Sequence, residues 1–164
     1  MDVANPLWQR YLLGQEAQRK ALGCHGLFLD TIWQEGQEIA VTNTIANFRK
    51  NWGNGYFIAN NAHLIKTLIR DSVDGFLFED FFTKGSTADH RLWYTKQMQE
   101  YQSIQKQYGK SLYAISYGNP FISPKWGNEV LKNALDYRFE VIFADANLTN
   151  IYGHVDFSAK KIVK

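Results

Sequence analysis

The chain has 164 residues and a formal net charge of +2, with 18 Lys and Arg against 16 Asp and Glu. The basic residues are spread along the sequence, so the basic patch of a nucleic-acid-binding protein is not expected. No stretch approaches the roughly 18 apolar residues of a membrane span, and residues 1–6 lack the basic and apolar segments of a signal peptide. The aromatic residues, 5 Trp, 9 Tyr and 11 Phe, are numerous enough to build a core and also to face ligands.

Helices and strands are predicted to alternate along the chain. Asn5 is a suitable N-cap and Pro6 suits the first helical position, which predicts a helix that ends at Gly23. Short apolar runs predict strands at 26–29, 56–59, 75–78, 111–115 and 139–144. Further helices are expected at 38–50, 62–70 and 88–108, and from Pro124 to about Leu135. The 62–70 helix is expected to carry one apolar side, formed by Leu64, Ile65, Leu68 and Ile69.

Five strands that alternate with helices predict an α/β fold with a parallel sheet. A (β/α)8 TIM barrel needs about 250 residues, so the chain would be a partial barrel with about five of its strands. A complete, five-stranded doubly wound fold is the alternative. Every predicted strand ends in a polar group, and a barrel directs all strand ends to one mouth, whereas an open sheet gathers ligands mainly at one switch point. The sequence therefore favours a single, partial barrel domain over 1–164.

Two of the apolar strands deliver a carboxylate at their carboxyl end. The run 26–29 leads into Asp30, and the run 75–78 leads into Glu79. The lack of alternation in both runs is typical of strands buried on both faces of a parallel sheet. Two carboxylates at one edge of such a sheet are what a glycoside hydrolase requires. The alternative is structural, with the acids in an ion pair, in a helix cap or in solvent.

Other polar residues follow the remaining strand ends. Asn60 and Asn61 are expected either to bind sugar hydroxyls or to cap the helix predicted from Ala62. Tyr117 and Asp145 are candidates for substrate binding, with a helix cap as the alternative for Asp145.

Two tryptophans lie in predicted strand-to-helix loops. Trp33 and Trp126 are candidates for stacking on sugar rings, and packing in the core is the alternative for both.

No metal or other cofactor is expected, because the four histidines show no ligand spacing. An acidic cluster of Asp30, Glu79, Asp80 and Asp145 would suit Mg²⁺ and a phosphate ester substrate. No Lys or Arg stands at a strand end to meet such a substrate. A magnesium-dependent phosphoesterase is therefore an alternative function.

The order of these motifs resembles glycoside hydrolase family 114, the endo-α-1,4-polygalactosaminidase-like TIM-barrel proteins. Residues 2–12 are similar to the family's D-x-x-N-P-x-W-x-x-Y-L segment, 26–31 to its fourth strand and 73–79 to its sixth strand with its glutamate. Asn60 and Asn61 fall at the end of the fifth strand, Ser116 and Tyr117 at the end of the seventh, and 144–148 at the close of the eighth.

The resemblance implies strands 4–8 of the barrel, without the first three β/α units. It implies that Asp30 is the nucleophile and Glu79 the acid/base of a retaining cleavage of α-1,4-linked amino-sugar polysaccharide of the galactosaminogalactan type. It also suggests a secreted or cell-surface protein that meets polysaccharide or oligosaccharide. A catalytically inactive, carbohydrate-binding remnant is the alternative. Because a partial barrel has open edges, near Leu27 and Val141, edge-to-edge self-association is also expected.

Overall fold

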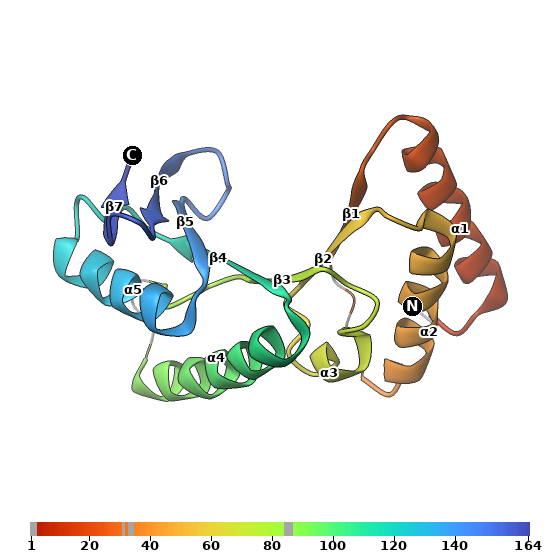
Figure 1. Ribbon diagram of the computed structural model, residues 1–164, viewed down its shortest axis with the longest axis horizontal. Coiled ribbons are helices and arrows are strands. Elements are labelled where there is room, and N and C mark those ends of the chain that lie inside the picture. Colours follow the sequence, from red (N-terminus) through yellow and green to blue (C-terminus); the bar gives the residue numbers. More distant parts are fainter. Residues whose placement is uncertain (1–2, 31, 33–34, 84–86) are drawn as a thin grey trace. The chain divides into compact units, whose positions relative to one another are not determined.

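The structure is a computed structural model that describes residues 3–30, 32, 35–83 and 87–164 (Figure 1). It divides into two compact units, Met1–Phe76 and Leu77–Lys164, here called the N-terminal and C-terminal units. The boundary falls inside the third strand. Each unit contains strands that are consecutive in the chain, together with the helices that connect them. Among the described helices, none is long and apolar enough to cross a membrane.

The N-terminal unit begins with a capped helix. Asn5 accepts a hydrogen bond from the Leu7 amide at 2.9 Å, as the Asn-Pro pair predicted. The elements are α1 (Pro6–Ala21), β1 (Gly26–Leu29), α2 (Glu38–Trp52), β2 (Tyr56–Asn60), α3 (Lys66–Ile69) and the start of β3 (Gly75–Phe78). β1 and β2 pair in parallel, from Gly26 opposite Tyr56 to Leu29 opposite Ala59. α1 contacts α2, and α2 contacts α3.

The C-terminal unit continues the sheet and ends in an antiparallel hairpin. Its elements are the end of β3, α4 (Ala88–Tyr108), β4 (Ser111–Tyr117), α5 (Pro124–Tyr137), β5 (Glu140–Ala144), β6 (Ile151–Asp156) and β7 (Lys161–Val163). β4 and β5 are parallel, whereas β5 with β6 and β6 with β7 are antiparallel. α4 contacts β4 and α5, and an ion pair between Arg91 and Glu129 joins the two helices.

The strand order identifies the fold class. Neighbouring strands follow chain order, β1-β2-β3 in the N-terminal unit and β3-β4-β5-β6-β7 in the C-terminal unit. A doubly wound sheet reverses its strand order at the switch point, whereas a barrel adds each strand beside the previous one. The α/β fold with a mostly parallel sheet is therefore that of a partial barrel, as predicted, and the doubly wound alternative is wrong.

The strands β6 and β7 were not predicted from the sequence. Residues 151–156 mix exposed, half-buried and buried positions and include Gly153, His154 and Asp156, so they lack the apolar run of a strand covered on both faces. Ile142 of β5 lies opposite His154 of β6, so the expectation of an open edge near Val141 is wrong. Among the described strands β1 ends the order at the other side, and self-association through that edge, near Leu27, stays a prediction.

Burial also corrects two apolar patterns. Phe28 in β1 is 56% exposed, so this strand is not covered on both faces. α3 is a single turn from Lys66, shorter than the 62–70 helix expected from the sequence. Ile65 and Ile69 are fully buried there, but Leu64 and Leu68 are exposed, so the predicted apolar side is only half correct.

Aromatic rings form the core of the C-terminal unit. Phe78 packs edge-to-face with Tyr94, Tyr101 and Phe139 at centroid distances of 5.6, 6.1 and 6.4 Å. Phe81 lies 5.2 Å from the ring of Phe139. Burying each such side chain contributes about 1.5–3 kcal/mol, so the residues on both sides of Glu79 are anchored in this core.

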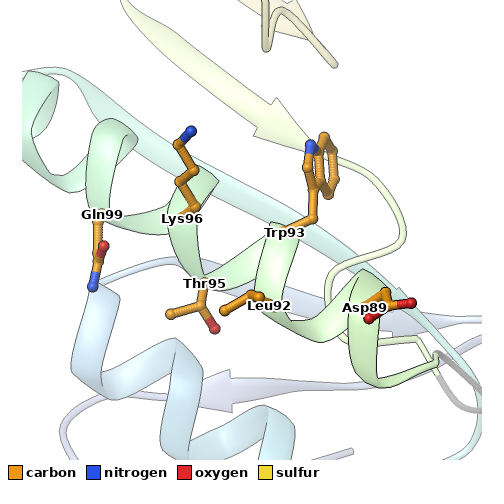
Figure 2. Close-up of a pocket in the computed structure, with 6 residues that line it drawn as sticks. All are labelled: Asp89, Leu92, Trp93, Thr95, Lys96 and Gln99. Atoms are coloured by element: carbon orange, nitrogen blue, oxygen red, sulfur yellow. The ribbon is translucent and has the colours of Figure 1, made fainter.

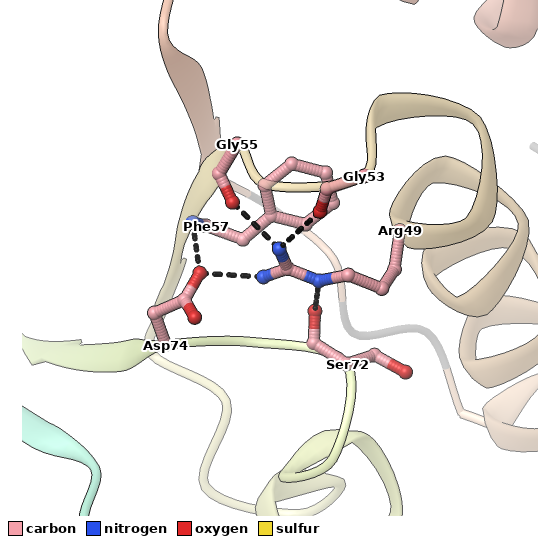
Figure 3. A network of polar contacts seen from close by, with 6 residues as sticks. All are labelled: Arg49, Gly53, Gly55, Phe57, Ser72 and Asp74. Carbon is pink, nitrogen blue, oxygen red and sulfur yellow. Dashed lines mark hydrogen bonds and ion pairs between the residues drawn. The ribbon is translucent and has the colours of Figure 1, made fainter.

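Arg49 is the polar centre of the N-terminal unit (Figure 3). From α2 its guanidinium donates to the carbonyl of Ser72 at 3.0 Å and to those of Gly53 and Gly55 at 3.2 and 2.6 Å. It also pairs with Asp74 at 2.5 Å. The same Asp74 oxygen accepts the amide of Phe57 at 2.7 Å, and the guanidinium lies 4.1 Å from the Phe57 ring centroid. One side chain thus joins α2, the turn before β2, β2 itself and the segment that enters β3.

We expect Arg49→Met to lower the free energy of unfolding by about 2 kcal/mol or more, because it leaves Asp74 and three carbonyls without their charged donor. Urea-induced unfolding followed by circular dichroism measures the change. Lys50→Met is the matched control, since Lys50 is exposed on the same helix, and should stay within about 0.5 kcal/mol of the wild type. Equal stability of the two variants would contradict the role given to Arg49.

Candidate functional site

Asp30 and Asn60 lie side by side at the carboxyl edge of the N-terminal unit. The register that pairs Leu29 with Ala59 continues to these two residues. The Asn60 side-chain nitrogen donates to the Asp30 carboxylate at 2.9 Å. Asp30 is exposed, whereas Asn60 is only 2% exposed. A buried amide thus fixes the orientation of an accessible carboxylate.

The other polar atom of the Asn60 side chain is its oxygen. This oxygen is buried and accepts no hydrogen bond from the described residues. An unpaired buried carbonyl is costly, and such groups concentrate where a ligand or a water completes the site.

The helix-cap alternative for Asn60 and Asn61 is wrong. α3 begins at Lys66, and its N-cap residue, Ile65, makes no side-chain cap. Asn61 instead takes a left-handed conformation, with φ of 47°, directly after β2. Asparagine tolerates this conformation better than most residues, so Asn61 turns the chain at the end of the strand.

Glu79 directly follows β3 and is half-buried. The next residues turn sharply, with φ of 58° at Asp80 and 48° at Phe82. The Phe81 amide donates to the carbonyl of Ile115 at 2.9 Å, so the segment is tied to β4. The carboxylate therefore stands at the start of a loop whose backbone is fixed.

Trp126 packs inside the C-terminal unit. It is 8% exposed, its ring lies edge-on to Phe143 at 5.7 Å, and its indole nitrogen donates to the carbonyl of Phe82 at 2.6 Å. The structure thus places it in the core, the alternative given above, rather than on an open surface. Trp33 lies outside the described residues.

Ser116 was identified from the sequence only as part of a strand end. Its side chain is fully buried in β4, and its hydroxyl donates to the carbonyl of Phe81 at 2.6 Å. The sequence signal is a small hydroxyl residue directly after the apolar pair Ala114 and Ile115. Its partner, 35 residues away in the chain, could not be read from that signal.

Tyr117 and Asp145 end the next two strands. Tyr117 is half-buried, and its amide donates to the Thr83 hydroxyl at 3.2 Å. The Asp145 carboxylate accepts bonds from the Thr149 amide and hydroxyl and from the Asn150 side chain, at 2.7, 2.6 and 2.7 Å. The Thr149 and Asn150 side-chain bonds lower the pKa of Asp145 to about 2. The next described element after Asp145 is the strand β6, so the helix-cap alternative is wrong and this carboxylate closes the turn into β6.

Two further features bear on ligand binding. In the part of the chain that the structure describes, no group of three or more His, Cys, Asp or Glu side chains is placed to hold a metal ion. A shallow pocket is lined by six residues of α4 alone, among them Leu92, Trp93 and Lys96 (Figure 2). Trp93 and Lys96 project from one side of the helix and Leu92 from another, so the polar groups do not converge as they do in a ligand site.

His63 follows the end of β2 and is mostly buried. Burial lowers its pKa from 6.5 to about 4, and the positive charge of Lys66 adds to the effect. The Lys66 ammonium itself donates to the carbonyl of His63. The fold therefore holds this imidazole in its neutral form at neutral pH.

The pKa of His63 predicts a pH dependence of stability. The unfolded chain takes up a proton near pH 6.5 that the folded chain takes up only near pH 4, so stability is full above 6.5 and falls as the pH drops towards 4. We expect the wild type to lose up to about 1.4 kcal/mol per pH unit within this window relative to His63→Gln. Urea unfolding at pH 7.5 and 5.0 measures both proteins, and equal slopes would contradict the assignment.

No protein-family model matches the sequence, and a search of curated proteins finds no match either. Solved structures do share the fold. The glycoside hydrolase domain of PelA from Pseudomonas aeruginosa aligns with a TM-score of 0.74 and 18% identity over 92% of this chain and 64% of that one, and a variant of that domain gives the same values. Ega3 from Aspergillus fumigatus, in complex with galactosamine, aligns with a TM-score of 0.66 and 16% identity over 92% and 61% of the two chains.

The chain thus spans slightly less than two thirds of the length of these neighbours. At these identities the likeness shows the fold. The α/β arrangement of this chain is similar to part of the fold of these neighbours.

Proposed function

We propose that this chain is a glycoside hydrolase-like protein that cleaves α-1,4-linked amino-sugar polysaccharide of the galactosaminogalactan type. One observation carries the proposal: on a fold shared with glycoside hydrolase domains, two strands, β1 and β3, are each followed directly by a carboxylate residue. The neighbour Ega3, which was solved with galactosamine, supports an amino sugar as the substrate. The proposal treats 1–164 as one domain, an incomplete barrel.

The proposed reaction uses two carboxyl groups. A carboxylate oxygen of Asp30 bonds to the anomeric carbon while the bond to the leaving oxygen breaks, and Glu79 gives its proton to that oxygen. In the second step Glu79 takes a proton from water, and the water oxygen replaces Asp30 on the anomeric carbon. Retention of configuration requires the carboxyl groups to be about 5–5.5 Å apart.

The surroundings of the two acids support these roles. Asp30 is exposed, as a nucleophile must be, and its orientation is fixed by Asn60. Glu79 is half-buried and begins a fixed loop. In the proposal Asn61 and Tyr117, which are half-buried at strand ends, contact sugar hydroxyls.

We expect Glu79→Gln and Asp30→Asn each to lower the rate of polymer cleavage by a factor of about 10² or more, because each removes a group that moves a proton or forms the covalent bond. The two losses should not multiply in the double variant, since both side chains serve one reaction path. Release of reducing ends measures the rate, and NMR of the first product shows whether its configuration is retained.

Asp80→Asn is the matched control. Asp80 is an exposed neighbour of Glu79 with a left-handed backbone, which asparagine adopts readily. The rate of polymer cleavage by Asp80→Asn should stay within a few-fold of the wild-type rate. If Asp80→Asn is as damaging as Glu79→Gln and added Mg²⁺ changes the rate, the magnesium-dependent phosphoesterase replaces the glycosidase.

A carbohydrate-binding remnant without activity is the second candidate. The observation that favours it is the low identity of 18% and 16% to these neighbours, because a shared fold at such identities does not carry the chemistry with it. Binding of the polymer without release of reducing ends, unchanged in Glu79→Gln, would select this candidate over the hydrolase.

A further inference from the structure

The first part of the loop after Glu79, residues 80–83, has a conformation that its sequence does not favour. Asp80 and Phe82 both lie in the left-handed region, with φ of 58° and 48°. Bulky side chains such as that of phenylalanine rarely adopt this region, and they persist there only when the surrounding structure holds them. Contacts from outside the loop must therefore fix its path.

Two buried donors provide these contacts. The Ser116 hydroxyl from β4 donates to the carbonyl of Phe81, and the Trp126 indole from α5 donates to the next carbonyl, that of Phe82, both at 2.6 Å. Two further bonds add to them. The Phe81 amide donates to the carbonyl of Ile115 at 2.9 Å, and the Tyr117 amide donates to the side-chain hydroxyl of Thr83 at 3.2 Å. Consecutive carbonyls of the loop are thus held by two different elements of the C-terminal unit.

The surroundings of Ser116 and Trp126 indicate that their polar groups serve the loop after Glu79. Ser116 is fully buried in a strand whose Leu112 and Ala114 are apolar and 1% exposed. A hydroxyl in this place costs free energy unless it is bonded, and its bond is to Phe81. The ring of Trp126 is packed so closely that a Cβ added to Gly118 would come within 2.8 Å of it, so the indole nitrogen has a fixed position.

We propose that Ser116 and Trp126 are positioning residues for Glu79, an inference that rests on the proposed function. They act through the carbonyls of Phe81 and Phe82, which fix the backbone that leaves Glu79. They thereby hold its carboxyl group where it can protonate the leaving oxygen. Neither side chain needs to touch the substrate.

The test uses substrates with different leaving groups. Cleavage of the amino-sugar polymer needs a proton from Glu79. The second substrate is an oligosaccharide of the same sugar that carries a 2,4-dinitrophenyl group, and its leaving group, 2,4-dinitrophenolate, departs without a proton. Azide replaces water in the second step and needs no base. We expect Ser116→Ala and Trp126→Phe to lower kcat on the polymer by about 10- to 100-fold, with KM within about 3-fold. With the dinitrophenyl substrate and azide, the rates should stay within about 3-fold of the wild type.

Two control variants separate positioning from general stability. Trp52→Phe changes a buried tryptophan of the N-terminal unit, and Ser103→Ala removes a hydroxyl that bonds within α4. Both should keep the wild-type ratio of the two substrate rates. Circular dichroism gives the folded fraction of each variant, by which its rates are divided.

The outcomes distinguish the two proposals. A wild-type chain that cleaves neither substrate overturns the proposed function and this inference with it. If the wild type cleaves the polymer but Ser116→Ala and Trp126→Phe either match it or lose both substrates equally, the positioning role is wrong and the proposed function stands. A selective loss on the polymer in both variants supports the inference.

Discussion

In-register pairing of parallel strands is the constraint on which the rest of the structure depends. Leu29 lies opposite Ala59, and Ser116 lies opposite Phe143, so neighbouring strands within each unit end at the same level. The polar residues that follow the strands are brought together for this reason alone. The contact between Asp30 and Asn60 is the direct product, because the two residues are 30 positions apart in the chain yet adjacent at the edge of the sheet.

Buried polar side chains hold the strand ends in place. Asn60, Ser116 and Trp126 are nearly or fully buried, and each donates a hydrogen bond to a group at or just beyond a strand end. Arg49 does the same for the backbone that enters β2 and β3. In both units, therefore, exposed or half-buried carboxylates are attached to backbone or side chains that buried hydrogen bonds hold in place. A functional site needs such support to keep its geometry constant.

The terminal hairpin changes how the sheet ends. β5 pairs with β4 on one side and with β6 on the other, so its backbone groups are satisfied without a further parallel strand. Asp145 forms the turn that makes this possible, since its carboxylate binds Thr149 and Asn150 just before β6. A residue that the strand-end pattern placed among substrate contacts thus has a clear structural task.

The sequence by itself determined the helices α1, α2, α4 and α5, the first five strands and the position of Asp30 and Glu79 at strand ends. These features depend on local signals: the Asn5 cap, the apolar runs, and Gly109, which ends α4 in a left-handed conformation. Only the tertiary structure decided the hairpin of β6 and β7, the exposure of Phe28 and the partners of Ser116 and Trp126. The physical reason is that burial and hydrogen-bond partners are set by residues far away in the chain, 44 positions away for Trp126 and Phe82.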